Sequence, residues 1–156
     1  MRPLRALAAI VCTSGFLFAD VANMSGKWAL NTKRSQWGNK PSPARVDLVI
    51  EHNEPAFKYS GSSQAPDERG PATFEFSGAI DEKEYPVKED GGQRKARFKR
   101  SSDNTVEGVY IGPDGKTQET TKTTVQRDGN TLVRQVRIKL PDGRVSSWTE
   151  VYEKSK

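Results

Sequence analysis

Cysteine and histidine are almost missing from this chain of 156 residues, which contains one of each. Cys12 lies in an apolar N-terminal run, so removal of that run leaves no cysteine for a disulfide, a zinc cluster or a thiol nucleophile. His52 falls on the apolar face of a predicted strand, where a lone histidine is more often a wall residue than a base. No metal-ligand spacing, nucleophile elbow or phosphate-binding glycine loop occurs. We therefore expect a protein that is not an enzyme and that holds no metal and no cofactor.

Long apolar runs are also missing, and the one short run, residues 7–18, follows two arginines near the N-terminus. Small residues follow it at Ala19 and Ala22, as in a cleavable secretory signal peptide. The run is too short to cross a bilayer comfortably as a helix. We predict a signal peptide over 1–22, cut after Ala19 or Ala22, and one domain over 23–156. The mature protein is then exported to the periplasm or the outside of the cell, without a transmembrane anchor.

Apolar residues make up 33% of the chain and charged residues 29%, and the mean hydropathy is −0.78. This composition suits a thin β structure in which each strand exposes one face to solvent. The formal net charge is +5, and the basic residues are densest over 94–100. Ala96 and Phe98 alternate with these cations, which is typical of a strand with a solvated face. Together with export, this pattern argues against a nucleic-acid partner.

What the sequence does contain is a set of regularly spaced turns. Three Asp-Gly pairs follow one another at intervals of fourteen residues: Asp114-Gly115, Asp128-Gly129 and Asp142-Gly143. Asp-Gly between alternating segments is a strong hairpin signal, because both residues tolerate a positive φ. Equal spacing predicts strands of equal length folded back on one another in an antiparallel meander.

The rest of the chain supports the same architecture. Alternating segments predict strands over 25–31, 45–52, 56–60, 73–80 and 83–87, with at most one helical turn near 32–37 and an exposed loop over 61–71. About ten antiparallel strands in up-and-down order close most economically into a barrel, which removes the sheet edges. We therefore predict an all-β, antiparallel up-and-down (meander) β-barrel of about 8–10 strands, with little helix apart from the signal segment.

Two-residue turns at the Asp-Gly pairs also predict which side chains face inward. They place Arg134 opposite Val151 and Tyr110 opposite Glu119, and they turn Tyr152 outward. The predicted inner face is apolar at one end and rich in hydroxyl groups at the other. Its polar members are Tyr110, Glu119, Thr121, Thr123, Arg134, Ser147 and Thr149. A slip of one residue would reverse every side chain of a strand.

Short motifs resemble a known group of barrels. The segment Gly26-Lys27-Trp28 is similar to the Gly-x-Trp signature on the first strand of lipocalins and fatty-acid-binding proteins, the calycin superfamily. The ending, residues 128–153, looks like the last two strands of the intracellular lipid-binding branch, and the whole resembles small exported bacterial lipocalin-like proteins. Residues 31–43 are too short and too rich in proline for the two-helix lid of that branch, and its Arg-x-Tyr motif appears here as Glu150-Val151-Tyr152.

The resemblance implies a binding protein for a small hydrophobic or amphipathic ligand in the barrel cavity. The cavity candidates are Arg134, Tyr110, Glu119, Thr121, Thr123, Ser147, Thr149, Phe74 and Phe76. Arg134 is either an anchor for an anionic group or, as the calycin resemblance implies, a structural clasp packed on Trp28 at the barrel floor.

Two other functions stay open. One is a filled barrel that acts as a protein-interaction or envelope module through strand 94–100 and loop 61–71. The other is a lipocalin-type enzyme, for which Glu51, Glu75 or Glu119 would have to supply an acid–base pair. In each case we expect a monomer.

Overall fold

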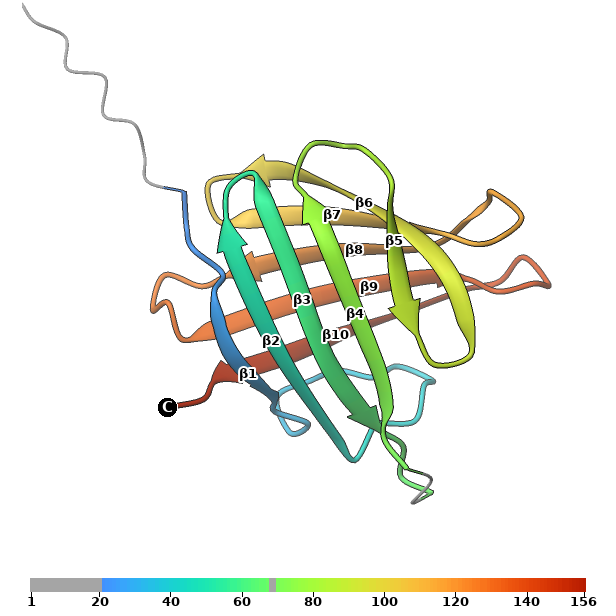
Figure 1. Cartoon of the computed structure of the whole chain (residues 1–156). Helices are drawn as coiled ribbons and strands as arrows, with labels where there is room; N and C mark the ends of the chain where they lie inside the picture. The colour runs from blue at the N-terminus through green and yellow to red at the C-terminus, as the bar shows by residue number, and fades with distance from the viewer. Residues whose placement is uncertain (1–20, 68–69) are drawn as a thin grey trace, which may run out of the picture.

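The structure is a computed structural model that describes residues 21–67 and 70–156, and within these residues every regular element is a β-strand. Ten strands close into one antiparallel barrel in which each strand pairs with its neighbours in the chain and β1 pairs with β10 (Figure 1). The strands are β1 Gly26–Leu30, β2 Arg45–Asn53, β3 Ala56–Gln64, β4 Ala72–Ala79, β5 Tyr85–Glu89, β6 Gly92–Ser102, β7 Thr105–Ile111, β8 Thr117–Val125, β9 Thr131–Lys139 and β10 Val145–Lys154. The predicted all-β up-and-down barrel is confirmed.

The two ends of the barrel differ. At the mouth, β2 begins, β3 ends and β9 turns into β10; at the opposite end, the floor, the N-terminal segment 21–25 enters. Residues 31–43, which we name the strap, continue from β1 along the same edge of β10, where Asn31 N–H donates to the carbonyl of Val151 and Gln36 forms an antiparallel bridge with Thr149. The strap then reaches the mouth. No helix long and apolar enough to cross a membrane occurs in the described residues.

The segments on either side of β2 differ slightly from the sequence prediction. Residues 32–34 form a turn without a helix. The predicted loop over 61–71 is partly wrong, because β3 continues to Gln64 and pairs with β4 along its length. Serine and glycine stay in the strand here because backbone pairing on both sides outweighs their weak intrinsic preference for β structure.

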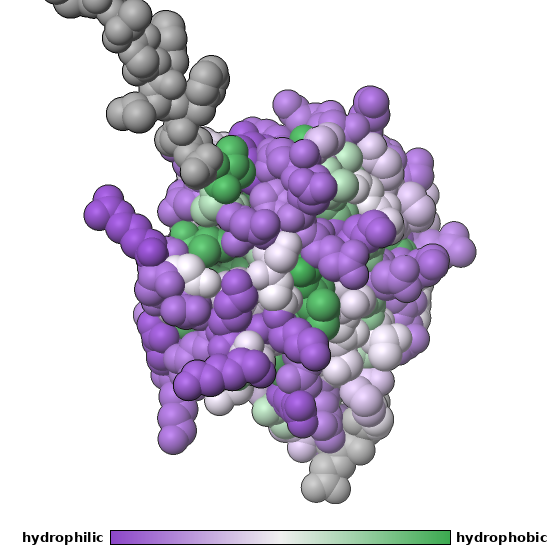
Figure 2. Space-filling view, turned by 60° about the vertical axis from the view of Figure 1, so that its left-hand side comes forward, coloured by the Kyte–Doolittle hydropathy of each residue, from purple (hydrophilic) through white to green (hydrophobic). Residues whose placement is uncertain are grey.

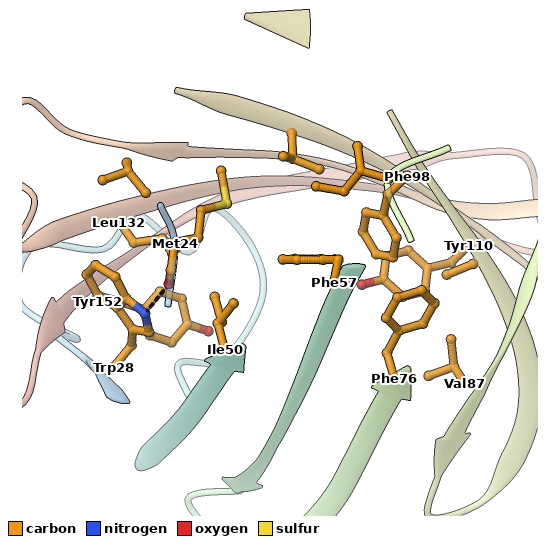
Figure 3. Close-up of a cluster of buried hydrophobic side chains, with 14 of the residues drawn as sticks. Met24, Trp28, Ile50, Phe57, Phe76, Val87, Phe98, Tyr110, Leu132 and Tyr152 are labelled. Carbon is orange, nitrogen blue, oxygen red and sulfur yellow. Dashed lines mark hydrogen bonds between the residues drawn. The ribbon is translucent and has the colours of Figure 1, made fainter. Parts of the chain in front are cut away.

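Side chains that point into the barrel form two connected groups. Near β1 and β10 lie Met24, Trp28, Ile50, Leu132 and Tyr152, and near β3 to β7 lie Phe57, Phe76, Val87, Phe98 and Tyr110 (Figure 3). The second group is mainly aromatic, with ring centroids of Phe76 and Phe98 4.8 Å apart in an edge-to-face arrangement that such rings prefer. The outer surface is mostly polar on the face that Figure 2 shows, with scattered apolar patches.

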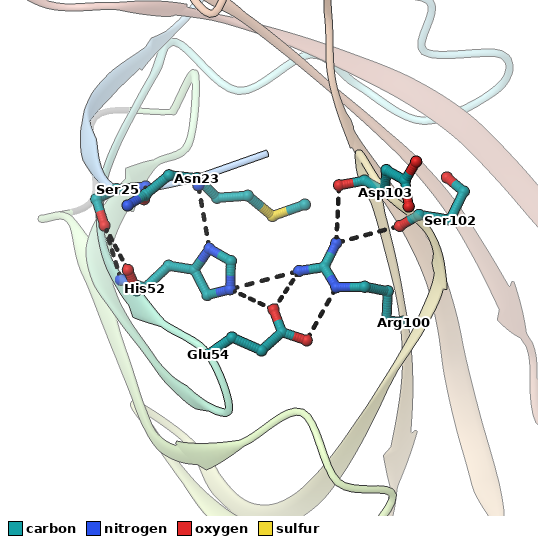
Figure 4. Close-up of polar contacts among 8 residues, drawn as sticks. Asn23, Ser25, His52, Glu54, Arg100, Ser102 and Asp103 are labelled. Carbon is teal, nitrogen blue, oxygen red and sulfur yellow. Dashed lines mark hydrogen bonds and ion pairs between the residues drawn. The ribbon is translucent and has the colours of Figure 1, made fainter. Parts of the chain in front are cut away.

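The N-terminal segment plugs the floor. Met24 is fully buried, its backbone N–H donates to Nδ1 of His52 at 3.2 Å, and its carbonyl accepts from Trp28 Nε1 at 3.0 Å. The other ring nitrogen of His52 contacts Glu54, which also pairs with Arg100 (Figure 4). His52 is thus a wall residue that ties the entering segment to the barrel.

Trp28 lies near the floor of the barrel, as predicted, but the cation that packs on its ring is Lys154 and not Arg134. The ammonium of Lys154 lies 5.2 Å from the Trp28 ring centroid, whereas Arg134 pairs with glutamates higher in the barrel. The predicted clasp between Arg134 and Trp28 is therefore wrong. The physical reason is the register of the last strand, which sets Lys154 opposite Trp28.

Two of the Asp-Gly turns have an odd number of loop residues. In the β9–β10 hairpin, Leu140 N–H donates to the carbonyl of Arg144, so residues 141–143 form a three-residue loop with Gly143 at φ 85°. Residues 113–115 form the same Pro-Asp-Gly loop between β7 and β8. A three-residue hairpin loop commonly places glycine in this left-handed conformation. An odd loop shifts the pairing by one residue relative to a two-residue turn.

The shift has different consequences in the two hairpins. Between β7 and β8 a bulge at Gln118 restores the predicted pairing of Tyr110 with Glu119. No register shift interrupts β9–β10, so Arg134 lies opposite Glu150 instead of Val151. The predicted register of β10 is wrong by one residue, and every side chain of that strand changes face.

The predicted signal peptide lies almost entirely in residues 1–20, outside the described residues. The two predicted signal residues that are described, Val21 and Ala22, differ in their surroundings. Val21 is 42% exposed, while Ala22 packs against the core and its N–H donates to the carbonyl of Asp103 at 2.8 Å.

Replacing the floor plug tests its contribution to stability. We expect Met24→Ala to lower the free energy of unfolding by about 2–5 kcal/mol, because it leaves a cavity beneath Trp28. Urea unfolding measures this loss, and an unchanged slope of the free energy against urea concentration indicates two-state behaviour. The control Val145→Ala removes a side chain that is 50% exposed and should stay within about 0.5 kcal/mol of the parent. Equal effects of the two variants would contradict this account of the floor.

Candidate ligand-binding cavity

A cavity of about 830 Å³ opens at the mouth of the barrel and reaches down to Ile50, Phe57 and Leu132. Of the predicted candidates, six side chains line it: Phe74, Tyr110, Glu119, Thr121, Thr123 and Arg134. Phe76 lies beneath it in the aromatic core, 1% exposed. The predicted placement of Ser147 and Thr149 in the cavity is wrong. The register of β10 turns these two side chains to the outer face and brings Ser146, Trp148 and Glu150 inside. Tyr152, predicted to face outward, is buried inside the barrel.

The wall formed by β2 to β5 is mainly apolar. Strand alternation points every second residue inward, and on these strands the inward positions hold aliphatic or aromatic side chains. They are Val46, Leu48, Ile50, Phe57, Tyr59, Phe74 and Val87. Pro41 and Pro43 of the strap add apolar surface at the mouth. This wall offers a ligand an apolar surface in which Ser63 is a polar position, and Glu89 of β5 lies at its boundary with the opposite wall.

The opposite wall contains a continuous chain of ion pairs across β5 to β10. Arg94 pairs with Glu89 at 2.7 Å and with Glu119 at 3.1 Å. Arg134 pairs with the other oxygen of Glu119 at 2.7 Å and with Glu150 at 3.0 Å. We name these five residues the ion-pair chain. Each guanidinium bridges two carboxylates, so every charge of the chain has a partner of opposite sign.

Glu150 ends the ion-pair chain and accepts two further hydrogen bonds. Trp148 Nε1 donates to one carboxylate oxygen at 2.7 Å, and the Tyr152 hydroxyl donates to the other at 2.9 Å. Burial opposes ionisation of Glu150, but the charge of Arg134 and these donors outweigh it and lower the pKa of the carboxyl. Glu150 is therefore an ionised, buried carboxylate whose oxygens are already occupied.

Two tyrosines join the walls near the aromatic core. The hydroxyls of Tyr59 and Tyr110 lie 2.9 Å apart, and the guanidinium carbon of Arg94 lies 4.9 Å from the Tyr110 ring centroid. Burial raises the pKa of both phenols, so both remain protonated at neutral pH. Since each hydroxyl can donate and accept, this pair offers a neutral polar contact to a ligand between the two walls.

Lys40 brings one more cation to the mouth from the strap. Its ammonium lies 4.0 Å from the Trp148 ring centroid and 5.9 Å from that of Trp37, and no described carboxylate forms an ion pair with it. Burial lowers the pKa of Lys40, while the charge of Glu150 opposes that shift. The indole N–H of Trp37 is buried without a hydrogen-bond partner among the described residues. The strap thus holds a cation and an unused donor beside the opening.

Several cavity residues were missed by the sequence analysis. Glu150 and Trp148 were assigned to the outer face by the one-residue error in β10. Arg94 was grouped with the solvated cations of 94–100, although its spacing from Ala96 and Phe98 places it on their inward face. That period-two pattern was a usable signal. No sequence signal indicated that Lys40 lies at the mouth, because the residues of the strap do not alternate with the period of a strand.

No group of three or more histidine, cysteine, aspartate or glutamate side chains suited to a metal ion occurs within residues 21–67 and 70–156.

Comparison with known proteins shows the fold. No family model matches the chain, and no curated protein matches its sequence. Among solved structures, the crystal structure of Rv2717c from M. tuberculosis resembles it with a TM-score of 0.54 over 85% of this chain and 93% of that one, at 13% identity.

The ion-pair chain predicts a pH dependence. The pKa of Glu150 is lowered in the folded protein, so the unfolded state binds the extra proton as the pH falls below the ordinary glutamate value of about 4.3. Stability is fully present above that value and is lost as the pH falls towards the folded pKa. We expect Glu150→Gln to flatten this acid limb in urea unfolding measured from pH 6 down to about 3. Glu75→Gln, which removes a carboxylate from the outer face, is the control for the loss of one charge.

Proposed function

We propose that this protein is an exported, calycin-like barrel that binds a small, uncharged amphipathic molecule in its cavity. The observation that supports this most directly is the contrast between the two cavity walls. A cavity of about 830 Å³ lies within the range of ligand pockets, roughly 300–1,000 Å³. A molecule that placed an apolar face against β2 to β5 and hydroxyl or carbonyl groups against β6 to β10 would match both walls.

The absence of charge on the proposed ligand follows from the ion-pair chain. Three carboxylates alternate with two guanidiniums, and the ammonium of Lys40 lies nearby, so the polar wall is close to neutral in sum. The two arginines are already paired, and the ammonium of Lys40 offsets the third carboxylate, so a carboxylate ligand would have to displace a glutamate from an arginine or add an uncompensated negative charge to the site. Both are costly in a buried site. Neutral hydrogen-bonding groups require neither change.

Features near the floor support the calycin assignment as part of this proposal. Trp28 of the Gly-x-Trp segment is buried under a cation, here Lys154. Tyr152, at the position of the tyrosine in the family's Arg-x-Tyr motif, points inward, and its hydroxyl donates to Glu150. Where that motif has an arginine, this chain has Glu150, which is consistent with a ligand that does not present a carboxylate.

We further propose that the protein acts by binding rather than by catalysis, as a monomer, in the periplasm or outside the cell. The carboxylates that line the cavity are those of the ion-pair chain, and each already forms an ion pair. A general acid or base needs a proton to exchange near the reaction pH, and the lowered pKa of Glu150 moves it away from that range.

Blocking the cavity tests the proposed site. Ile138 lines the cavity, and its neighbour Lys139 points outward on the same strand. We expect Ile138→Trp to weaken binding of the uncharged dye N-phenylnaphthylamine by at least about tenfold, because the larger ring fills the ligand's space. Lys139→Trp should bind the dye as the parent does. Fluorescence titration gives the affinities, and circular dichroism checks that each variant folds. Dye binding that both variants retain would place the site elsewhere.

The charge of the ligand is tested with a matched pair of dyes. Anilinonaphthalene sulfonate resembles N-phenylnaphthylamine but adds one sulfonate. We expect the uncharged dye to bind at least about tenfold more tightly, because the sulfonate loses water and adds an uncompensated negative charge to a wall whose carboxylates already balance Arg94, Arg134 and Lys40. The reverse order would contradict an uncharged ligand. Failure of both dyes and of neutral lipids extracted from the natural host would instead favour a filled barrel acting through its surface.

A further inference from the structure

A second concave site lies on the outside of the barrel, on the reverse of the polar cavity wall. Outward-facing side chains of β6 to β10 form the base of a groove of about 800 Å³. Gln36 and Gly38 of the strap and Glu82 of the β4–β5 loop also line it. The exterior of a barrel is normally convex, so a hollow of this size requires flanking segments. We name it the outer groove.

The strand register arranges the base of the outer groove in two rows. Across the strands, one row runs through Arg97, Val109, Thr120, Arg137 and Ser147. The next row runs through Lys99, Glu107, Lys122, Gln135 and Thr149. Neighbouring strands are about 4.8 Å apart, so the backbones of Arg97 and Arg137, three strands apart, are separated by about 14 Å.

The cations of the outer groove differ from several outward lysines elsewhere on the barrel. On β2 to β6, outward lysines lie beside carboxylates, as in Lys58–Glu51 at 3.9 Å, Lys88–Glu75 at 3.7 Å and Lys95–Glu84 at 3.5 Å. Within the groove, Lys99 pairs with Glu107 at 3.2 Å. Its remaining cations, Arg97, Lys122 and Arg137, have no ion-pair partner among the described residues.

Apart from Glu82 at the edge of the groove, the other side chains on its base are mostly uncharged and polar. Thr120, Gln135, Ser147 and Gln36 present hydroxyls and amides, and Val109 is the one aliphatic side chain on the base rows. On the two base rows, Val109 is the single contact for a lipid tail or an aliphatic peptide side chain. A carbohydrate provides many hydroxyls, and guanidiniums suit carboxylates or phosphates attached to it. A separation of about 14 Å between the two arginine backbones favours a ligand with several such anions.

We infer that the outer groove binds a segment of an anionic glycan, a saccharide chain bearing carboxylate or phosphate groups. This site is independent of the proposed cavity ligand, because adjacent residues on one strand serve the two faces: Thr120 faces the outer groove and Thr121 faces the cavity. Binding outside would tether the barrel to a polyanionic surface while the mouth remained open to its own ligand.

The experiment uses a fluorescently labelled oligogalacturonate as the probe and measures its anisotropy with the exported protein. We expect saturable binding that weakens as salt rises, since both arginines and Lys122 form ionic contacts. Arg97→Gln/Arg137→Gln should weaken binding by at least about tenfold, equivalent to about 1.4 kcal/mol. Lys27→Gln/Lys139→Gln, which removes two cations outside the groove, should change it by less than about twofold, a difference of about 0.4 kcal/mol.

The remaining outcomes overturn the inference. If a neutral maltooligosaccharide binds with the same affinity as the labelled probe, the groove does not recognise the charge of the glycan. If a polyglutamate peptide binds more tightly than the probe, the partner is an acidic protein. Preferential binding to phosphatidylglycerol vesicles would indicate a membrane surface, and no binding of the labelled probe would leave the groove a solvated face. An unchanged circular dichroism spectrum and urea midpoint of the double arginine variant show that the barrel is intact, whether or not the cavity binds a dye.

Discussion

The ion-pair chain inside the barrel is the constraint on which the organisation of the mouth depends. Glu119 lies between Arg94 and Arg134, and Glu150 joins Arg134 to Trp148 and Tyr152. Buried charges are stable only when all of them are paired, so five strands must hold their register for the wall to exist. This requirement explains how a barrel with few apolar residues keeps an open cavity: the polar wall is supported by ion pairs and hydrogen bonds instead of by filling side chains.

The same strands serve two surfaces of opposite character. On β8 and β9, Thr121 and Arg134 face a neutralised interior, whereas Thr120 and Arg137 face a groove with unpaired cations. The period-two alternation of a strand makes this possible within one sheet. An uncharged ligand inside and an anionic one outside would then be recognised by separate residues, so the two proposals can succeed or fail separately.

Much of the fold was readable from local chemistry. The Asp-Gly pairs located the hairpins, and alternation placed Phe74, Tyr110 and Glu119 inside, where the structure has them. The candidate site was predicted only in part. Ser147 and Thr149 were assigned to the wrong face because the three-residue loop before β10 shifts the register by one residue. The same loop before β8 caused no error, since the bulge at Gln118 compensates for it. Nothing in the two Pro-Asp-Gly turns distinguishes these cases.

The sequence by itself determined the class of structure: short alternating strands, regular turns and too few apolar residues for a solid sandwich. These are local properties, because turn propensity and strand period depend on neighbours in the chain. Only the tertiary structure decided which charges meet. The pairing of Arg134 with Glu119 and Glu150, and of Lys154 with Trp28, depends on the closure of β10 onto β1 and on a bulge in another hairpin. Such contacts are set by the register of the whole barrel, which no single segment encodes.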